Sequence, residues 1–296
     1  MRKLPHPLTL LIRWGSYPLI FGGSAILLLS LLQRGIPAWP ASLPVVALAL
    51  LAVALLERLQ PFRRSWLEDH DDSLTDAIHL LVNLGLIQLG SLLLGLLGPW
   101  LSLQLFPLHW PWWVQLLLVA ALIDCSLYLM HRASHRFAWL WRLHAPHHSA
   151  ERLYWVNGER RHPLSALLLA GPGLVLLALL GAPAQLCATW FALLTVHLAF
   201  QHANLDYDLG PLRRLLAVAQ MHRWHHKRDF EDAQVNFGEF LLLWDWLLGS
   251  YHDSAERLGE AEVGLRERDY PRGYLGQLWQ PFRRVTSSVP GETGKS

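Results

Sequence analysis

Histidines are the residues in this sequence whose types and spacing are best suited to chemistry. Sixteen of the 296 residues are histidine, and eight form one HxxxH motif and two HxxHH motifs: His131 and His135, then His144, His147 and His148, then His222, His225 and His226. Positions i, i+3 and i+4 share one helix face, so we expect each triplet to present three imidazoles to a common centre. Because neutral imidazole is the commonest side-chain ligand for transition metals, the motifs predict a metal site.

The number of histidines predicts two metal ions, because eight ligands exceed the four of one tetrahedral ion. His162 in "ERRHP" and His202 in "FQHANLD" lie at the ends of an apolar hairpin, and we expect them to be further ligands. His79 and His197 lie inside apolar segments, where a hydrogen-bonded core role is expected. The eight clustered histidines could instead form a basic surface that faces the membrane, but such a surface would use Lys and Arg and would not keep the i, i+3, i+4 spacing. A bis-histidine haem would need single histidines on separate helices.

Four other side chains are candidates for supporting the site. Asp124 and Tyr128 extend the helix face of the HxxxH pair toward the amino terminus. Metal-bound imidazoles usually donate their second N–H to a carboxylate or carbonyl, and Asp124 is the first candidate acceptor and Asp245 the second. Each could instead be a helix cap or the partner of a nearby arginine. Asn236 and Gly238 are expected to form a turn that returns the carboxy-terminal segment over the site.

The elements that must position these residues are apolar helices. Hydrophobic residues make up 52% of the chain and charged residues 16%, well below the quarter that is typical of soluble domains. Helices long enough to cross a bilayer are expected at Tyr17–Leu32, Leu43–Leu56, Leu74–Leu97 and Trp112–Met130. The turn "GAP" predicts a further hairpin of two short apolar helices, which spans or dips into the bilayer: Leu164–Leu180 and Ala184–Phe200.

The charge pattern limits the partners and predicts an orientation. A net charge of +2 without a basic stripe excludes a nucleic-acid partner. Cys125 and Cys187 have no CxxC spacing, so neither a disulfide framework nor an iron–sulfur site is predicted. The loop Gly98–Pro111 has no charged residue, whereas Lys and Arg gather on the other side, so the amino terminus and the histidines are expected to be cytoplasmic. Short loops favour a bacterial inner membrane.

The ordered motifs "HRASH", "WRLHAPHH", "RRHP", "QHAN", "MHRWHH", "NFGEF" and "WDWLLGSYH" carry a resemblance. Over about Leu74 to Tyr251 the chain resembles the fatty acid hydroxylase and sterol desaturase superfamily of integral-membrane di-iron enzymes. The resemblance implies a four-span membrane part, a cytosolic helical cap and a histidine-bound di-metal centre. It also implies that O2 and two external electrons are used to hydroxylate or desaturate a lipid. The HxxxH spacing fits the sterol desaturase and alkylglycerol-monooxygenase-like branches without separating them.

We therefore expect an all-α integral membrane protein with three parts. Residues 1–73 are expected to be a two-span membrane segment, residues 74–251 a fatty acid hydroxylase-like catalytic domain, and residues 252–296 a cytosolic segment. The end of that segment, "RVTSSVPGETGKS", is expected to be disordered because of its composition.

The expected activity is hydroxylation of a lipid C–H bond, on a fatty acyl, sterol-like or ether lipid, by two iron ions, with zinc possible in the purified protein. The alternatives are a lipid desaturase and a non-catalytic zinc-binding membrane protein. No dinucleotide, iron–sulfur or haem motif is present, so electrons are expected from a separate ferredoxin or cytochrome. Five basic residues could contact such a donor or anionic lipid headgroups: Arg213, Arg214, Arg223, Lys227 and Arg228.

Overall fold

The protein is described by a computed structural model that covers residues 5–254, 256–259, 262–267 and 269–283. Within these residues it is all-helical, with isolated β-bridges as its only extended pairings. Six helices are long and apolar enough to cross a membrane: α1 (His6–Gln33), α2 (Ala38–Leu59), α3 (Ser73–Leu101), α4 (Trp112–Arg136), α6 (Pro163–Leu180) and α7 (Ala184–His202). The predicted all-α membrane fold is confirmed. The predicted disordered end, residues 284–296, lies outside the described residues.

Prolines and glycines set the ends of these helices. Pro111 precedes α4, and Pro163 begins α6, where a missing N–H costs no helical hydrogen bond. Gly181 ends α6 with φ +85°, a left-handed conformation that glycine adopts without a steric penalty. The predicted turn between α6 and α7 is therefore present. With 18 and 19 residues, these helices are about 27 and 29 Å long, close to the thickness of a hydrocarbon core.

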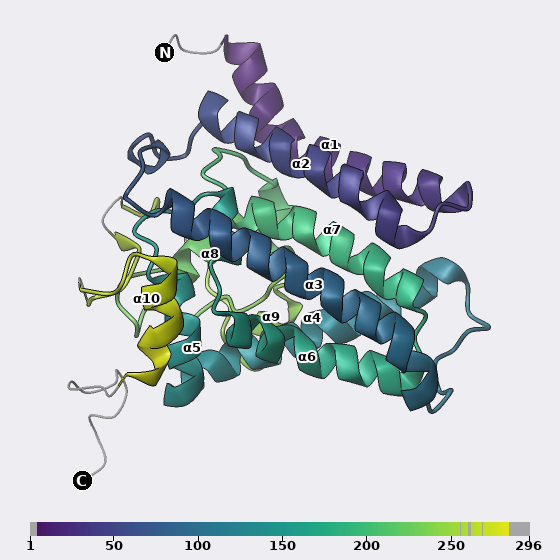
Figure 1. Ribbon diagram of the computed structural model, residues 1–296. Coiled ribbons are helices and arrows are strands. Elements are labelled where there is room, and N and C mark those ends of the chain that lie inside the picture. Colours follow the sequence, from purple (N-terminus) through teal and green to yellow (C-terminus); the bar gives the residue numbers. More distant parts are fainter. Residues whose placement is uncertain (1–4, 255, 260–261, 268, 284–296) are drawn as a thin grey trace.

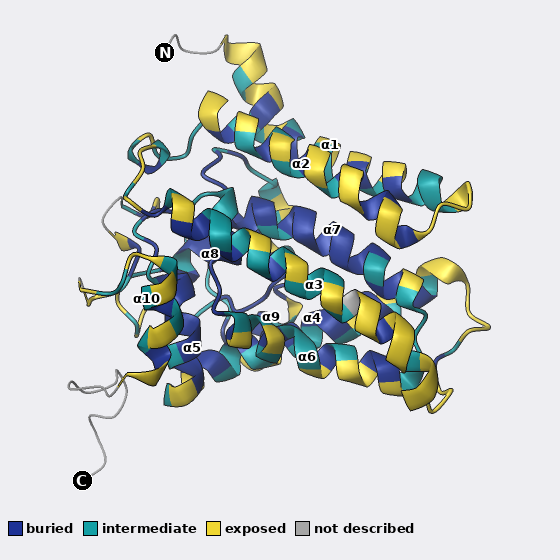
Figure 2. Ribbon diagram, in the orientation of Figure 1, coloured by how far each residue is buried: buried dark blue, intermediate teal, exposed yellow. Residues whose placement is uncertain are grey.

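The six long helices run antiparallel along one direction, with α7 in the middle (Figure 1). α7 packs against α1, α2, α3 and α4. Buried residues of α7 belong to three apolar cores of the bundle. The first core also contains residues of α1, α2 and the segment after α7. The second contains residues of α3, α4 and α6, and the third contains residues of α1 and α2. Most residues of α7 are buried, whereas the neighbouring helices carry many exposed residues (Figure 2), a large share of them apolar. α1 and α2 therefore pack as part of the same bundle, and the three-part division stays a prediction.

A cap of short elements covers the end of the bundle where α4 and α7 finish (Figure 1). It contains α5 (Ala138–His148), α8 (Ala219–His225) and α10 (Tyr274–Trp279). α9 (Leu243–Leu248) lies farther along the bundle, beside the middle of α4. The hydrogen bond from the Trp244 indole to Asp124 marks this position. The 3₁₀ segments are η1 (Ser65–Leu67), η2 (Trp155–Glu159), η3 (Gly210–Arg214) and η5 (Gln280–Phe282).

Buried ion pairs join the start of α3 to the segment that follows α5. The Arg152 guanidinium lies 2.8 Å from Asp72 and also donates to the Trp66 carbonyl. Arg160 pairs with Asp76 at 3.1 Å and lies 3.6 Å from Asp72. Because both arginines are almost fully buried, each charge depends on its partner, and the pairs fix the cap on the bundle.

We predict that Arg152→Ala destabilises the protein by about 3 kcal/mol, the low end of the range for removing one partner of a buried pair, because Arg160 remains near Asp72. The free energy of unfolding in detergent would be measured by denaturant titration. The matched control is Arg266→Ala, which breaks exposed pairs with Asp229 and Glu231 and should lower the free energy of unfolding far less. Equal losses in the two variants would contradict a structural role for the Arg152 pair.

Candidate metal centre

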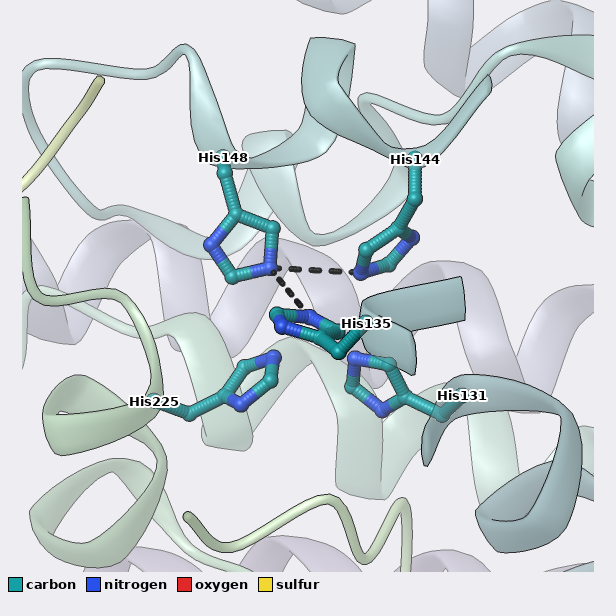
Figure 3. Close-up of side chains that lie close together, drawn as sticks. All are labelled: His131, His135, His144, His148 and His225. Atoms are coloured by element: carbon teal, nitrogen blue, oxygen red, sulfur yellow. Dashed lines mark hydrogen bonds between the residues drawn. The ribbon is translucent and has the colours of Figure 1, made fainter. Parts of the chain in front are cut away.

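The first group of histidines combines α4, α5 and α8. Its five imidazoles are fully buried and converge on one point (Figure 3), with their ligand nitrogens all within 4.8 Å of one another: His131, His135, His144, His148 and His225. We call this group cluster 1. The HxxxH pair leaves the end of α4, and the α5 pair approaches it from the next helix.

The second group, cluster 2, lies beside the first and contains four histidines that meet the same 4.8 Å limit: His147, His202, His222 and His226. The two clusters touch, since the rings of His148 and His226 are stacked with centroids 4.6 Å apart. His202, which the sequence suggests as a further ligand, lies within this cluster. All nine imidazoles come from residues 131–226.

Each HxxHH triplet divides between the two clusters. His144 and His148 belong to cluster 1 and His147 to cluster 2. In the second triplet His225 belongs to cluster 1, whereas His222 and His226, the residue directly after α8, belong to cluster 2. The expectation that a triplet converges on one centre is therefore wrong. Successive residues are about 100° apart around a helix, so positions i and i+4 point the same way while i+3 points to the side. One HxxHH motif can thus contact two adjacent ions.

Hydrogen bonds alone do not explain how closely the nitrogens of cluster 2 approach. The Nε2 atoms of His202, His222 and His226 form a triangle with sides of 3.1, 3.1 and 3.2 Å. Each neutral Nε2 carries either one hydrogen or one lone pair, so at most two sides of a triangle can be hydrogen bonds. Four nitrogens bound tetrahedrally to one ion at about 2.0–2.1 Å would lie about 3.3–3.4 Å apart. The spacing therefore fits a shared cation.

The outer nitrogens of two cluster 1 rings have partners that fix their tautomers. Nδ1–H of His131 donates to the Phe237 carbonyl at 2.9 Å, and Nδ1–H of His225 donates to the Val235 carbonyl at 2.9 Å. The Nε2 atoms of both rings are buried and accept no hydrogen bond from any described residue. A lone pair directed into such a cluster is the donor that a metal ion requires.

Burial also keeps the imidazoles outside the spans neutral. Desolvation, followed by the proximity of other cationic groups, places the pKa values well below 6.5 for His144, His147, His148, His222, His225 and His226. Only the deprotonated nitrogen binds a metal, so these rings are ready to bind without first losing a proton at neutral pH.

The two predicted carboxylates do not contact an imidazole. Asp245 accepts N–H groups of Phe237 and Gly238 at 2.8 and 2.9 Å, and Asp124 accepts the Phe240 N–H at 2.9 Å and the Trp244 indole at 2.9 Å. The expectation of direct contact is wrong because the loop between α8 and α9 lies between the carboxylates and the rings. The carboxylates hold that loop, and its carbonyls orient the rings.

Tyr128 and Asn236 support the same loop. The Tyr128 hydroxyl bonds to Ser250 at 2.9 Å and accepts from Arg132, so it has no contact with either cluster. Asn236 has φ +52°, and its side chain donates to the carbonyls of Met221 and His252 and accepts the His252 N–H. Residues 236–238 are irregular and do not form the predicted turn, but the Asn236 side chain holds the segment after α9 against α8.

Three other histidines lie outside the clusters. His162 caps α6: its Nδ1 accepts the Leu164 N–H at 3.1 Å and its Nε2 lies 3.2 Å from the Leu278 carbonyl. Both nitrogens are occupied, so the structure does not join His162 to the proposed ligands. His79 forms hydrogen bonds with the Arg161 carbonyl and the Gln277 side chain, and His197 forms one with the Tyr17 hydroxyl, as expected for core residues.

Sequence reasoning missed Glu239 and Arg161. The Glu239 carboxylate pairs bidentately with the Arg161 guanidinium at 3.1 and 3.0 Å, and it lies 3.3 Å from Nδ1 of His131. Burial alone would lower the pKa of Arg161, but the negative charges of Glu239 and Glu159 have the larger effect, so the pKa is raised. An acidic residue inside the apolar run "NFGEF" is a signal that could have revealed Glu239, because a buried carboxylate needs a cationic partner.

The basic residues considered for donor docking are largely engaged within the protein. Arg223 is buried and donates to the carbonyls of Ala203 and Leu205. Arg213 pairs with Asp253, and Lys227 pairs with Asp232 at 2.8 Å. These contacts argue against an open basic patch there.

An apolar pocket in the membrane-spanning part ends near cluster 1. We call it the inner pocket; it lies between α3, α6 and α7, has a volume of about 110 Å³, and is lined mainly by Leu, Ile, Ala and Gly side chains. Its polar residues are Asn83, Glu159, Arg161, Thr195 and Glu239. Since Glu239 also faces His131, the pocket ends beside cluster 1.

Comparisons with known proteins identify the family. The sequence model described as fatty acid hydroxylase matches residues 116–250, which include all nine cluster histidines. Ornithine lipid hydroxylase OlsE of Rhizobium tropici is 33% identical over 252 residues, which cover 81% of this chain and 75% of that protein. The chain belongs to the fatty acid hydroxylase family.

Other relatives of this fatty acid hydroxylase family member are longer proteins. Alkylglycerol monooxygenase of Danio rerio is 29% identical over 60% of this chain, and that of Homo sapiens is 28% identical over 54%. The chain spans 39% and 35% of the lengths of these two relatives. No solved structure matches the chain.

We predict that each cluster binds its own ion. His135→Ala should empty cluster 1, and His222→Ala should empty cluster 2, so each variant loses about half of the metal bound by the unchanged protein. Elemental analysis of purified protein would measure metal per chain. His162→Gln is the control and should keep full occupancy, whereas a loss of metal in that variant would restore His162 as a ligand.

We predict that Glu239→Gln weakens metal binding by about 10- to 100-fold, the range for removing a group that orients a ligand, because the neutral amide no longer supports His131. Competition with a chelator would measure the affinity. Asp253→Asn, which removes a carboxylate paired with Arg213 away from the clusters, is the control. Unchanged affinity for the metal in Glu239→Gln would mean that Glu239 only pairs with Arg161 and does not support the metal ligand His131.

Proposed function

We propose that this protein is a membrane-bound di-iron oxygenase that hydroxylates a C–H bond of a membrane lipid. The observation that carries the proposal is the junction of the inner pocket with cluster 1 at Glu239, which lies 3.3 Å from His131. With two iron ions bound, the centre would supply the chemistry in which O2, two electrons and two protons convert C–H to C–OH and release water. Zinc can replace iron in the purified protein.

The residues of the chain have separate tasks in this reaction. The nine imidazoles hold the ions, and the loop carbonyls of Val235 and Phe237 keep the rings of His225 and His131 in orientation. The aliphatic lining of the inner pocket excludes water, so a hydrocarbon can lie beside the centre. Glu159 lies at the pocket wall, where burial raises the pKa of its carboxyl group and the nearby Arg161 lowers it.

The arrangement favours an enzyme over a structural zinc protein. Five donors in cluster 1 exceed the four of a structural zinc site, and such a site has no need of an apolar pocket that ends beside it. Hydroxylation is favoured over desaturation because the relatives at 33% and 29% identity are named as a hydroxylase and a monooxygenase. Ornithine lipids and alkylglycerol lipids are the first substrates to test.

The electrons come from a separate redox protein in this proposal, because no second cofactor motif occurs in the sequence. We place the centre on the cytoplasmic side of a bacterial inner membrane. The loop between α3 and α4, at the opposite end of the bundle, has no charged residue, whereas the described end that carries the cap is rich in arginine.

We predict that cells producing the protein accumulate a membrane lipid with one additional oxygen atom, and that cells producing His147→Ala do not. Loss of one cluster 2 ligand removes an ion without altering the membrane-spanning helices. Mass spectrometry of total lipid extracts would make the comparison, with membrane insertion of both proteins checked by fractionation. Identical lipid profiles from metal-loaded protein and the variant, with each candidate lipid supplied, would contradict the proposal.

A further inference from the structure

A second pocket, lined by polar and charged side chains, lies against α8 at the cap end of the bundle. We call it the polar pocket; its volume is about 170 Å³, and its wall comes from the start of α1, the segments after α2 and α7, α8 and residues 253–258. Gln220, Arg223 and Trp224 line it and lie about 100–200° around α8 from His222. α8 therefore separates the polar pocket from cluster 2, and the catalytic account does not use this pocket.

The charges that line the polar pocket are balanced. Four arginines and four carboxylates contribute to its wall: Arg13, Arg213, Arg223, Arg257, Asp206, Asp208, Asp253 and Glu256. Six of these eight groups pair with each other at 3.3–3.5 Å. Arg223 and Glu256 form no ion pair with any residue that the structure describes. The pocket thus keeps one cation and one anion that lack a partner of opposite charge.

Two buried polar atoms in the wall of the polar pocket have no hydrogen-bond partner. Arg223 is only 4% exposed and uses one terminal nitrogen for the carbonyls of Ala203 and Leu205, but its buried Nε–H finds no acceptor among the described residues. The Gln220 side chain hydrogen-bonds to the Asp208 carboxylate, and its buried oxygen finds no donor. Since buried polar groups are normally satisfied, this unused donor and acceptor point to a ligand.

A ligand that satisfies this wall must carry both an anion and a cationic hydrogen-bond donor. A phosphate or carboxylate group would accept from Arg223, whose guanidinium lies 3.6 Å from the centroid of the Phe62 ring and is held in its plane by that contact. An ammonium group would donate to the Gln220 oxygen and lie near the exposed Glu256 carboxylate. Because the wall has no net charge, a zwitterion keeps the pocket balanced, whereas a simple anion or cation does not.

The polar pocket lies at the level of the lipid headgroups. The 28 residues of α1 make it about 42 Å long, so it extends beyond a hydrocarbon core of about 30 Å. Its start lies at the same end of the bundle as the cap (Figure 1), and Arg13 lines the pocket from its second turn. The neighbouring Trp14 is 50% exposed, and tryptophan is typical of the membrane–water interface. A lipid whose headgroup enters the pocket can therefore keep its chains against Leu11 and Trp14 on the outer face of α1.

We propose that the polar pocket binds the zwitterionic headgroup of a membrane lipid. The anionic group of the headgroup lies against Arg223, and its ammonium group lies between the Gln220 oxygen and the Glu256 carboxylate. This site is separate from the metal centre because α8 lies between them. The inference therefore goes beyond the proposed hydroxylase activity and does not depend on it.

The test compares phosphatidylethanolamine, which carries a phosphate and an ammonium group, with phosphatidylglycerol of the same acyl chains, which carries the phosphate alone. Native mass spectrometry of the purified, delipidated and metal-loaded protein would measure both affinities. Phosphatidylethanolamine should bind the unchanged protein more tightly. Gln220→Met removes the acceptor with little change in volume and should weaken phosphatidylethanolamine by about tenfold or more, because a hydrogen bond to a charged group is lost, while phosphatidylglycerol stays unchanged.

Two further variants test the charges of the polar pocket. Arg223→Gln removes the cation and should weaken both lipids, whereas Glu256→Gln should weaken only phosphatidylethanolamine. Glu256 is exposed, so its substitution tests the site even if Arg223→Gln does not fold. Gln33→Met is the matched control for Gln220→Met, because Gln33 is exposed at the other end of α1 and does not line the pocket. Thermal unfolding and metal content would verify that each variant is folded.

Soluble glycerophosphoethanolamine, the same headgroup without acyl chains, distinguishes a lipid from a free metabolite. It should bind about tenfold more weakly or less, because it lacks the chains that contact α1. Phosphatidylethanolamine that binds elsewhere on the membrane-facing surface contributes equally in Gln33→Met and Gln220→Met, so the difference between them reports the pocket. Unchanged affinity in folded Gln220→Met and Glu256→Gln would overturn the proposal and leave water as the occupant of the pocket. Equal affinity of the soluble headgroup and the lipid would overturn the assignment to a lipid.

Discussion

The structure depends on one constraint, the burial of nine imidazoles whose nitrogens face each other. Three Nε2 atoms of cluster 2 lie 3.1–3.2 Å apart, and the hydrogen atoms of neutral rings cannot satisfy all three contacts. Charging the rings would add repulsion between closely spaced, buried groups. Two cations resolve this conflict, because each would accept the lone pairs of its cluster and supply the positive charge in one place.

The remaining elements keep the rings in this arrangement. α4, α5, α7 and α8 each contribute histidines, so no single helix forms a cluster. The loop after α8 orients the rings through its carbonyls, and it is held in turn by Asp124 and Asp245. Buried pairs of Arg152 and Arg160 fix the cap to α3. The same bundle leaves an apolar pocket between α3, α6 and α7, and Glu239 in its wall lies 3.3 Å from His131.

Much of this could be predicted from the sequence. Hydropathy located the six long helices because a bilayer requires about twenty apolar residues in each, and the "GAP" turn separated α6 from α7. The HxxxH and HxxHH spacings identified eight of the nine cluster histidines, because local periodicity decides which side chains share a helix face. His202 could be suggested only from its place at the end of an apolar segment.

The parts that failed depend on contacts between distant segments. Helical periodicity separates position i+3 of each triplet from positions i and i+4, but which cluster each side chain joins depends on where α5 and α8 lie relative to each other. Asp124 and Asp245 act through backbone groups of a loop, and Glu239 meets Arg161 across 78 residues. His162 resembled the ligands in type and position, yet its cap on α6 uses both of its nitrogens.

The central claim is that imidazoles alone hold two metal ions at the end of the bundle. X-ray absorption at the metal edge of the purified, iron-loaded protein measures the donor atoms directly. We expect a first shell dominated by nitrogen at about 2.0–2.2 Å, with the multiple-scattering pattern of imidazole rings, and no sulfur. A shell of oxygen atoms without imidazole scattering would mean that the iron is bound elsewhere, and it would contradict the account.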